Sequence, residues 1–252
     1  MWNSIRSAAI WTATVLLIIV WLPFLALIRL FDRDPVHYRT GRWFRRLGKS
    51  MTRINPFWKL DISGYSLDEP HQPLVIVCNH QSMADIPLIS NLPWEMKWLA
   101  KIELFKVPFV GWMMRMAGDI PVDRQAKERR RDAVVHAYSY LKQGCPVMFF
   151  PEGTRTRDGK IHRFSDGAFL LAIKTGAPIL PLAIDGSREC LPKNSWRFGG
   201  LNNIRLKVME PVDTKGLTKK DIPELRDRIR GMIVNQLAEW QGVEADQIDG
   251  LK

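Results

Sequence analysis

The sequence predicts an α/β fold in which a mostly parallel sheet is covered by helices, preceded by a separate N-terminal element of two helices. Two observations support this prediction. From residue 59 onward, short runs of β-branched residues alternate with stretches of helical periodicity, and such alternation is typical of a parallel sheet. Residues 1–58 instead hold an uncharged apolar run followed by a basic stretch. We therefore expect two domains, residues 1–58 and residues 59–252.

The uncharged run covers residues 8–28, between Arg6 and Arg29. A helix of this length extends about 32 Å, which matches the roughly 30 Å of hydrocarbon in a bilayer. A secretory signal has a shorter apolar core and a cleavage site of small residues, and neither pattern occurs here. We expect the run to remain on the mature protein. Pro23 can kink or end the helix, so a single crossing and a shallow re-entrant element both fit.

The basic stretch, residues 36–58, carries two stripes at helical spacing. The apolar stripe is Trp43, Leu47, Met51 and Ile54, and the basic stripe is Arg39, Arg42, Arg46, Lys49 and Arg53. Such a pattern predicts an amphipathic helix that lies among lipid headgroups. The alternative is an ordinary surface helix that docks on the body of the protein.

The net charge of +11 is concentrated near the N-terminus. Residues 1–60 contain ten Lys and Arg against two Asp, together with five of the ten tryptophans. A basic, tryptophan-rich segment points to an anionic surface, and a membrane fits better than nucleic acid because an apolar anchor is present. Nine of these basic residues follow the apolar run and only Arg6 precedes it. This asymmetry places the main domain on the cytoplasmic side of the membrane.

The composition of the whole chain, 46% hydrophobic and 25% charged, excludes a disordered chain and a polytopic membrane bundle. Three cysteines are too few for a disulfide framework. The expected strands cover residues 74–78, 96–100, 120–122, 146–150, 178–184 and 204–209. The expected helices cover residues 82–90, 107–117, 126–142, 166–175 and 221–240. Residues 245–252 are predicted to be a frayed tail.

Several common catalytic motifs are missing. The chain has no G-x-S-x-G, no H-E-x-x-H and no G-x-x-x-x-G-K-[ST] segment, and no G-x-G-x-x-G follows a strand. Serine hydrolysis, zinc hydrolysis, ATP use and dinucleotide binding are therefore disfavoured, and we expect no metal site.

The segment Asn-His-Gln-Ser-Met-Ala-Asp, residues 79–85, directly follows a predicted buried strand. If His80 lies in the loop and Asp85 in the first helical turn, the carboxylate can fold back to the imidazole. Such a carboxylate fixes one tautomer and stabilises the protonated ring, so the other nitrogen can accept a proton. This pair suits the activation of a substrate hydroxyl. The alternative is a capping aspartate near an unrelated histidine.

Two further strand exits carry polar residues. In Phe-Phe-Pro-Glu-Gly-Thr-Arg, residues 149–155, Gly153 lets backbone amides approach a ligand, and Thr154 and Arg155 offer donors suited to a phosphate. The alternative is a plain turn with an exposed arginine. In Gly-Asp-Ile-Pro-Val-Asp-Arg, residues 118–124, a short strand ends in an Asp–Arg pair. These exits would meet at one edge of a parallel sheet, where α/β folds bind ligands.

The order N-H-x-S-x-x-D, V-D-R, F-P-E-G-T-R and Ala-Pro-Ile-Leu-Pro-Leu (residues 177–182) resembles the 1-acyl-sn-glycerol-3-phosphate acyltransferase family over residues 60–215. The resemblance implies that His80 is the catalytic base and Asp85 its orienting carboxylate. It further implies that the acceptor phosphate is held by Arg124, Gly153, Thr154 and Arg155, with Glu152 shaping the site and Lys101 serving the phosphate or an oxyanion. One departure is that this block reads Ile-Pro-Val-Asp-Arg, where many members have an aromatic residue and isoleucine before Asp-Arg.

The same resemblance implies the activity. An acyl group would pass from a thioester, acyl-CoA or acyl carrier protein, to the sn-2 hydroxyl of lysophosphatidic acid and give phosphatidic acid without an acyl-enzyme or a cofactor. The expected partners are the bilayer and these substrates, not nucleic acid, and the expected location is the cytoplasmic face of the bacterial inner membrane. The alternatives are transfer to another lysolipid such as lyso-ornithine lipid, or a non-catalytic protein that binds anionic lipid.

Overall fold

The computed structural model describes residues 2–67, 71–123 and 127–251. Contacts within the chain divide it into two compact units. The first unit comprises residues 1–56, 69–73 and 87–148, and the second comprises residues 57–68, 74–86 and 149–252. The predicted division at residue 58 into two domains of different function stays a prediction.

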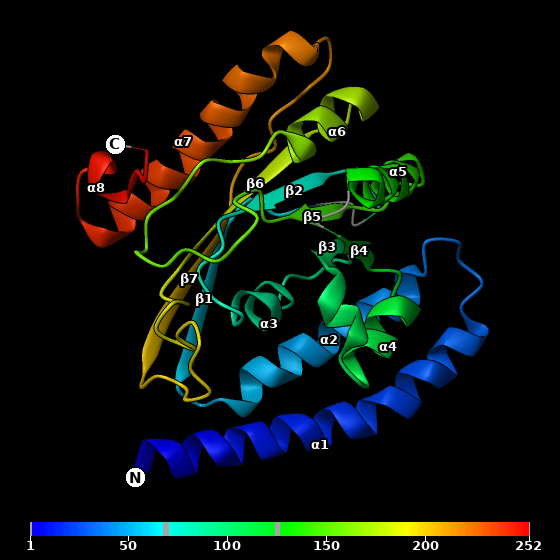
Figure 1. The fold of residues 1–252 in the computed structure, drawn as a ribbon, viewed down its shortest axis with the longest axis vertical. Coiled ribbons are helices and arrows are strands. Elements are labelled where there is room, and N and C mark those ends of the chain that lie inside the picture. The colour runs from blue at the N-terminus through cyan, green and yellow to red at the C-terminus, as the bar shows by residue number, and fades with distance from the viewer. Residues whose placement is uncertain (1, 68–70, 124–126, 252) are drawn as a thin grey trace. The chain divides into compact units, whose positions relative to one another are not determined.

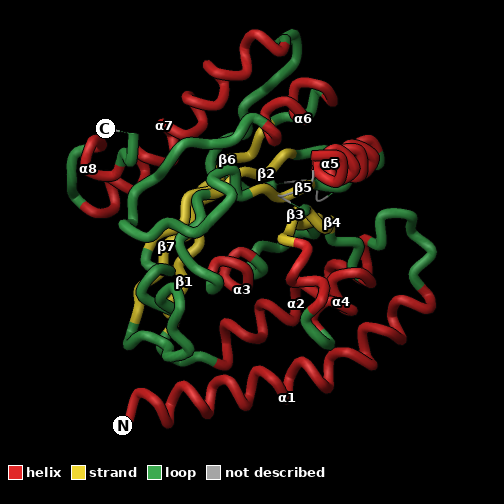
Figure 2. Tube along the Cα trace, in the orientation of Figure 1, coloured by secondary structure: helices red, strands yellow, loops and turns green. Residues whose placement is uncertain are grey.

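The helices are α1 (Trp2–Phe31), α2 (Tyr38–Ile54), α3 (Asp85–Ile89), η1 (Ile102–Lys106), α4 (Val110–Met116), α5 (Lys127–Lys142), α6 (Gly167–Thr175), η2 (Lys219–Asp221), α7 (Ile222–Gln241) and α8 (Ala245–Ile248). The strands are β1 (Trp58–Gly64), β2 (Val75–Cys78), β3 (Lys97–Lys101), β4 (Ile120–Val122), β5 (Val147–Phe149), β6 (Ile179–Asp185) and β7 (Asn202–Val208). Helices and strands alternate through most of the chain, as Figures 1 and 2 show.

The strands of the described residues confirm a mostly parallel α/β fold. In the second unit the order is β1-β7-β6-β2, and in the first it is β5-β3-β4. β1 pairs with β7 in parallel from Trp58↔Asn202 onward, and β2 pairs with β6 in parallel from Val75↔Ile179. β3 is parallel to both β4 and β5, whereas β6 and β7 are antiparallel. The edge strand β1 escaped the sequence analysis because most of its residues are exposed and polar residues interrupt it.

The core of the second unit explains why the buried runs form strands. All four residues of β2 and the first six of β6 are buried, as expected for parallel strands covered on both faces. α6 contacts β2 and α7 contacts β6 (Figure 2). The buried stripe of α7 includes Leu225, Ile229, Ile233 and Leu237, at the spacing of one helical face.

The C-terminal residues form a short helix, so the prediction of a frayed tail is wrong. Ile248 of α8 is buried, and Ile161 donates its N–H to the Ile248 carbonyl at 2.9 Å. The carboxylate of Asp249 accepts hydrogen bonds from the buried Arg230. An apolar anchor and an ion pair together hold this segment in place.

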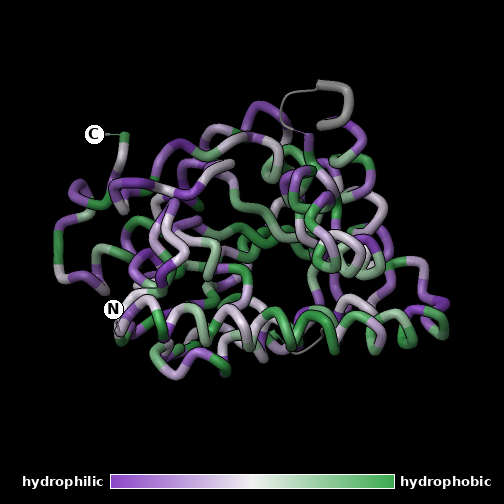
Figure 3. Tube along the Cα trace, turned by 60° about the horizontal axis from the view of Figure 1, so that its bottom comes forward, coloured by the Kyte–Doolittle hydropathy of each residue, from purple (hydrophilic) through white to green (hydrophobic). Residues whose placement is uncertain are grey.

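α1 runs along α2 within the first unit (Figure 1). It continues from Trp2 to Phe31 through Pro23, and among the described residues it is the helix long and apolar enough to cross a membrane. One face of the helix is apolar and exposed; Val20, for example, is 69% exposed. In Figure 3 most of the helix is green, the colour of hydrophobic residues. The apolar N-terminal helix indicates association with a membrane.

α2 is amphipathic, but its apolar stripe contacts protein. Leu47 lies in a buried cluster with Leu25 of α1 and Met113 of α4, and Trp43 and Met51 pack against that cluster. Contrary to the expectation that this stripe faces lipid headgroups, it faces the neighbouring helices. The exposed apolar surface is therefore supplied by α1.

Candidate active site

The candidate active site begins where β2 ends, in the second unit. Asn79 fixes the point at which the chain leaves the strand. Its side-chain nitrogen donates to the Ile184 carbonyl at 2.9 Å, and its side-chain oxygen accepts the Ile184 N–H at 2.9 Å. Because both bonds connect to β6, the loop that follows starts from a fixed position.

The structure brings His80 and Asp85 together. Asp85 is the first residue of α3, and its Oδ2 lies 2.7 Å from Nδ1 of His80. The same oxygen accepts the backbone N–H groups of Gln81 at 2.8 Å and Ser82 at 2.9 Å. Since this fully buried carboxylate faces donors, Nδ1 carries the proton and Nε2 is the nitrogen left for a ligand.

Phe150 holds the imidazole from its face. The two rings stack with centroids 4.0 Å apart and an interplanar angle of 18°, while 12% of the His80 side chain stays exposed. The sequence analysis gave Phe150 no role, although its position directly before Pro151 and Glu152 was an available signal. The ring of His80 is thus fixed by Asp85 at its edge and by Phe150 at its face.

Glu152 fixes the backbone of the same loop. One of its carboxylate oxygens accepts the N–H of His80 at 3.0 Å, and the other accepts the N–H of His162 at 3.1 Å. Burial raises the pKa of Glu152, although these two hydrogen bonds oppose the rise. On the other side, Thr156 donates its N–H to the His80 carbonyl at 2.9 Å. The segment 152–156 therefore holds both backbone groups of His80.

Gly153 forms the turn that makes this arrangement possible. Its φ of 72° is left-handed, and a Cβ placed there would meet nothing within 4 Å, so the conformation rather than crowding favours glycine. Its N–H donates to the Phe150 carbonyl at 3.0 Å and is thereby already used. Thr154 is exposed and Arg155 is half-buried, which leaves both side chains accessible to a ligand.

Comparisons with known proteins place these residues in a family. A model of the Acyltransferase family matches residues 59–185, which contain both the His80 and the Glu152 segments. The mouse 1-acyl-sn-glycerol-3-phosphate acyltransferase alpha is 34% identical over 197 residues, covering 76% of this chain and 67% of that protein. This chain belongs to the 1-acyl-sn-glycerol-3-phosphate acyltransferase family.

Two further members agree in sequence and in fold. The chloroplastic 1-acyl-sn-glycerol-3-phosphate acyltransferase of Arabidopsis thaliana is 33% identical over 202 residues, which cover 80% of this chain. This chain spans 55% of the length of that relative. The crystal structure of the 1-acyl-sn-glycerophosphate acyltransferase PlsC from Thermotoga maritima matches with a TM-score of 0.78 and 28% identity, covering 95% of this chain and 98% of that one.

Two residues that the resemblance assigns to the family's phosphate site stay predictions. Lys101 ends β3 in the first unit, where its amine pairs with Glu103 at 3.3 Å and its side chain is 54% exposed. Arg124 lies outside the described residues. The catalytic and binding roles of His80, Asp85 and residues 152–155 are likewise inferred from their chemistry and from the family motifs.

Other reactive groups near the acyltransferase motif are engaged or protonated. Cys78 is fully buried, and burial raises the pKa of its thiol well above the usual range. The hydroxyl of Ser82 donates to the Leu191 carbonyl at 2.9 Å. Within residues 2–67, 71–123 and 127–251, no group of three or more His, Cys, Asp or Glu side chains is arranged to hold a metal ion. The expectation that no cofactor is needed stays a prediction.

Proposed function

We propose that this protein transfers an acyl group from an acyl thioester to the sn-2 hydroxyl of lysophosphatidic acid and thereby forms phosphatidic acid. The family supports an acyltransferase reaction, and the names of the curated relatives supply the substrate class. The observation that carries the proposal is the contact between His80 and Asp85, which leaves Nε2 of a fixed, partly exposed imidazole for the substrate.

The geometry favours direct attack over an acyl-enzyme. Ser82 is the hydroxyl nearest to His80 in the chain, and it is buried and bonded to a carbonyl. The Cys78 thiol is buried and held protonated by its raised pKa, whereas a nucleophilic cysteine requires the thiolate. Both observations support attack by the hydroxyl of the acceptor.

In the proposed reaction, Nε2 of His80 takes the proton of the acceptor hydroxyl while the hydroxyl oxygen forms a bond to the carbonyl carbon of the thioester. The carbonyl oxygen gains the negative charge of a tetrahedral intermediate. Its collapse breaks the carbon–sulfur bond, and the departing thiolate receives the proton held by the imidazolium. Asp85 stabilises the imidazolium through Nδ1, and Phe150 and Glu152 hold the ring and its backbone in position.

Positively charged groups are proposed to hold the acceptor phosphate. Arg124, Thr154 and Arg155, with the turn at Gly153, would bind it, and Lys101 would serve the phosphate or the oxyanion. An arginine guanidinium matches a phosphate with two parallel donors. Accessible side chains at Thr154 and Arg155 support this assignment.

Residues 1–58 are proposed to dock the enzyme on the cytoplasmic face of a bacterial inner membrane. The exposed apolar face of α1 would enter the bilayer, and the basic residues of α2, such as Arg39, Arg46 and Arg53, are exposed and would meet anionic headgroups. The docked enzyme would reach an acceptor that resides in the membrane, while the donor, acyl-CoA or acyl carrier protein, would arrive from the cytoplasm.

Purified protein incubated with labelled acyl-CoA or acyl carrier protein and a panel of lysolipids tests the proposal, with products identified by mass spectrometry. Formation of phosphatidic acid supports it. A product derived only from lyso-ornithine lipid or another lysolipid would replace the acceptor, and lipid binding without any product would refute the enzymatic function.

A further inference from the structure

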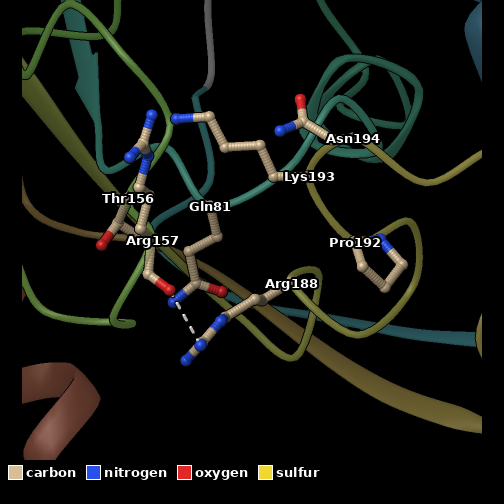
Figure 4. A pocket seen from close by; sticks show the side chains of 7 residues that line it. All are labelled: Gln81, Thr156, Arg157, Arg188, Pro192, Lys193 and Asn194. Atoms are coloured by element: carbon tan, nitrogen blue, oxygen red, sulfur yellow. Dashed lines mark hydrogen bonds between the residues drawn. The ribbon is translucent and has the colours of Figure 1, made fainter.

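A cavity of about 430 Å³ lies within the second unit and is lined in part by Gln81 of the loop that follows His80. Apart from one proline, its lining side chains are polar or charged: Gln81, Thr156, Arg157, Arg188, Lys193 and Asn194 (Figure 4). A volume of this size is typical of small-molecule sites. Gln81 follows His80 in the chain, and Thr156 donates its N–H to the His80 carbonyl at 2.9 Å, so two of the lining residues are joined to the backbone of the proposed base.

Positive charges gather in this cavity without a carboxylate partner. None of Arg157, Arg188 and Lys193 forms an ion pair with a carboxylate of the described residues. Figure 4 shows the side chains of Arg157 and Lys193 extending toward one another. Partial removal from water and the neighbouring charges of Arg157 and Arg155 lower the pKa of the Lys193 amine. Crowded like charges of this kind favour a bound anion.

Backbone carbonyl groups hold these cations in place. Lys193 donates to the Arg155 carbonyl at 3.0 Å, and Arg188 donates through Nη2 to the Arg157 carbonyl at 2.9 Å. An ammonium has three N–H donors and a guanidinium has five, so each side chain keeps donors for a ligand. The carboxylate of Asp158 is instead engaged by Thr156, Lys160 and His162.

The loop that carries Arg188 and Lys193 is attached to the catalytic loop. Ser82 donates to the Leu191 carbonyl at 2.9 Å, and Ser187 donates to the Gln81 side chain at 3.4 Å. A tight turn at Asn194, with φ of 66°, fixes the backbone beside Lys193. The position of the cations relative to His80 is therefore determined by direct bonds between the two loops.

We propose that this cavity binds the phosphate groups of the acyl thioester donor, with Arg188 and Lys193 as specificity-determining residues. The inference rests on the proposed function and adds a donor site to it. The cations Arg157, Arg188 and Lys193 in the lining suit an anionic group, and the single phosphate of the acceptor is already assigned to other residues. Acyl-CoA and acyl carrier protein share the phosphate of the pantetheine arm, and acyl-CoA adds the phosphates of its nucleotide.

The test uses the full chain with Arg188→Gln, Lys193→Gln and the double substitution. Arg228→Gln is the matched control, because Arg228 is an exposed residue of α7 that does not line the cavity. Loss of one charge-assisted hydrogen bond to phosphate is expected to raise the apparent KM for acyl-CoA about tenfold. The KM for lysophosphatidic acid and kcat should change less than about twofold, and the control should match the wild type.

Comparison of three acyl donors identifies which phosphate of the donor the cavity binds. A rise seen with acyl-CoA but not with acyl-dephospho-CoA or acyl carrier protein identifies the 3′-phosphate of the nucleotide, and an equal rise with all three identifies the pantetheine phosphate. Either result supports a donor site. An unchanged donor KM, or a rise confined to the KM for lysophosphatidic acid, would overturn it.

Calorimetric titration with CoA separates this inference from the proposed function. If the wild type transfers no acyl group, the proposed function fails. Weaker CoA binding in the Arg188 and Lys193 variants than in the Arg228 variant would still support a phosphate-binding site in the cavity. Equal CoA binding by all variants refutes the donor site even when transfer is intact.

Discussion

Two polar clusters in this protein differ in whether an accessible polar atom is left for a ligand. In the first unit, the ammonium of Lys97 donates to Glu95 at 3.0 Å and to the carbonyl groups of His37 at 3.2 Å and Ala117 at 2.7 Å. All three of its donors are used, and its side chain is fully buried. In the second unit, His80 uses Nδ1 on Asp85 and keeps Nε2 at a partly exposed ring.

The Lys97 cluster links helices and strands of its own unit. Arg45 of α2 donates to Asp119 at 2.5 Å, and the same carboxylate oxygen accepts the Trp98 N–H of β3 at 3.1 Å. Burial raises the pKa of Glu95, although the charges of Lys97 and Arg45 oppose the rise. The comparison teaches that burial and charge alone do not mark a reactive site. A site also needs one acceptor or donor that the fold leaves unpaired and reachable.

His80→Ala is expected to give the largest effect. Removing a general base lowers kcat by about 10³-fold, while thermal unfolding should shift less, because the Asp85 carboxylate keeps the backbone N–H groups of Gln81 and Ser82 as donors. Steady-state transfer assays measure kcat, and a thermal melt measures the unfolding temperature. His136→Ala, at an exposed position of α5, is the control, and substantial turnover in the His80 variant would contradict the base assignment.

Lys97→Met tests the closed cluster. The substitution leaves Glu95 buried without its ammonium partner, and we expect a loss of about 3–5 kcal/mol in the free energy of unfolding. Urea denaturation measures this loss. Combining it with Glu95→Leu should recover part of the stability, because the pair is then removed together. A single variant as stable as the wild type would show that the cluster contributes less than its burial indicates.

Glu152→Gln tests whether the Glu152 carboxylate supports catalysis by holding the backbone N–H of His80. The His80 and His162 N–H groups bond to different oxygens of Glu152. In glutamine one of these oxygens becomes an NH2 donor and cannot accept its N–H group, so kcat should fall about tenfold. Since the pKa of Glu152 is raised in the folded protein, the folded state binds the proton more tightly than the unfolded chain. The stability of the wild type relative to this variant should therefore decrease as pH rises from its usual value near 4.5 through the raised pKa. Urea midpoints at several pH values measure the trend, and a flat difference would contradict it.

Asp158→Asn should give the smallest effect. Hydrogen bonds from Thr156, Lys160 and His162 outweigh burial and lower the pKa of Asp158 to about 2. A lowered pKa stabilises the folded protein above the usual value of 3.8, and this contribution is lost as pH falls toward 2. Because the side chain is 49% exposed, we expect less than about 1 kcal/mol at neutral pH. Denaturation of the wild type and the variant is compared at pH 7 and pH 3. A larger loss of stability in the variant at pH 3 than at pH 7 would contradict the prediction.

Much of the fold could be predicted from the sequence because buried runs and helical periodicity are local signals. Strands β2 and β6 are continuous apolar runs, and α7 has a clear apolar stripe. β1 and α8 were missed because long-range pairing decides them: β1 is defined by its register with β7, and α8 is held by Ile161 and Arg230. The sequence left open whether lipid or protein covers the apolar stripe of α2, because periodicity identifies an apolar face but not its partner.

In the candidate site, too, local contacts could be predicted from the sequence and long-range contacts could not. The spacing of His80 and Asp85 in a loop and a first helical turn was sufficient to expect their contact, because that geometry is local. The stacking of Phe150 on His80 and the bonds from Glu152 to two separate backbone groups depend on how distant segments meet. Such contacts have no fixed spacing in the chain, so only the folded arrangement reveals them.

The contact between α1 and α2 has a consequence for any attempt to shorten the apolar N-terminal helix. Leu25 closes over Leu47 and Met113, and the indole of Trp21 donates to the Trp43 carbonyl at 3.2 Å. A truncation that removes the first 31 residues would strip this cover and bare the apolar side of α2. α1 is thus part of the folded first unit, and its removal would give an unstable protein that aggregates through the uncovered apolar side of α2.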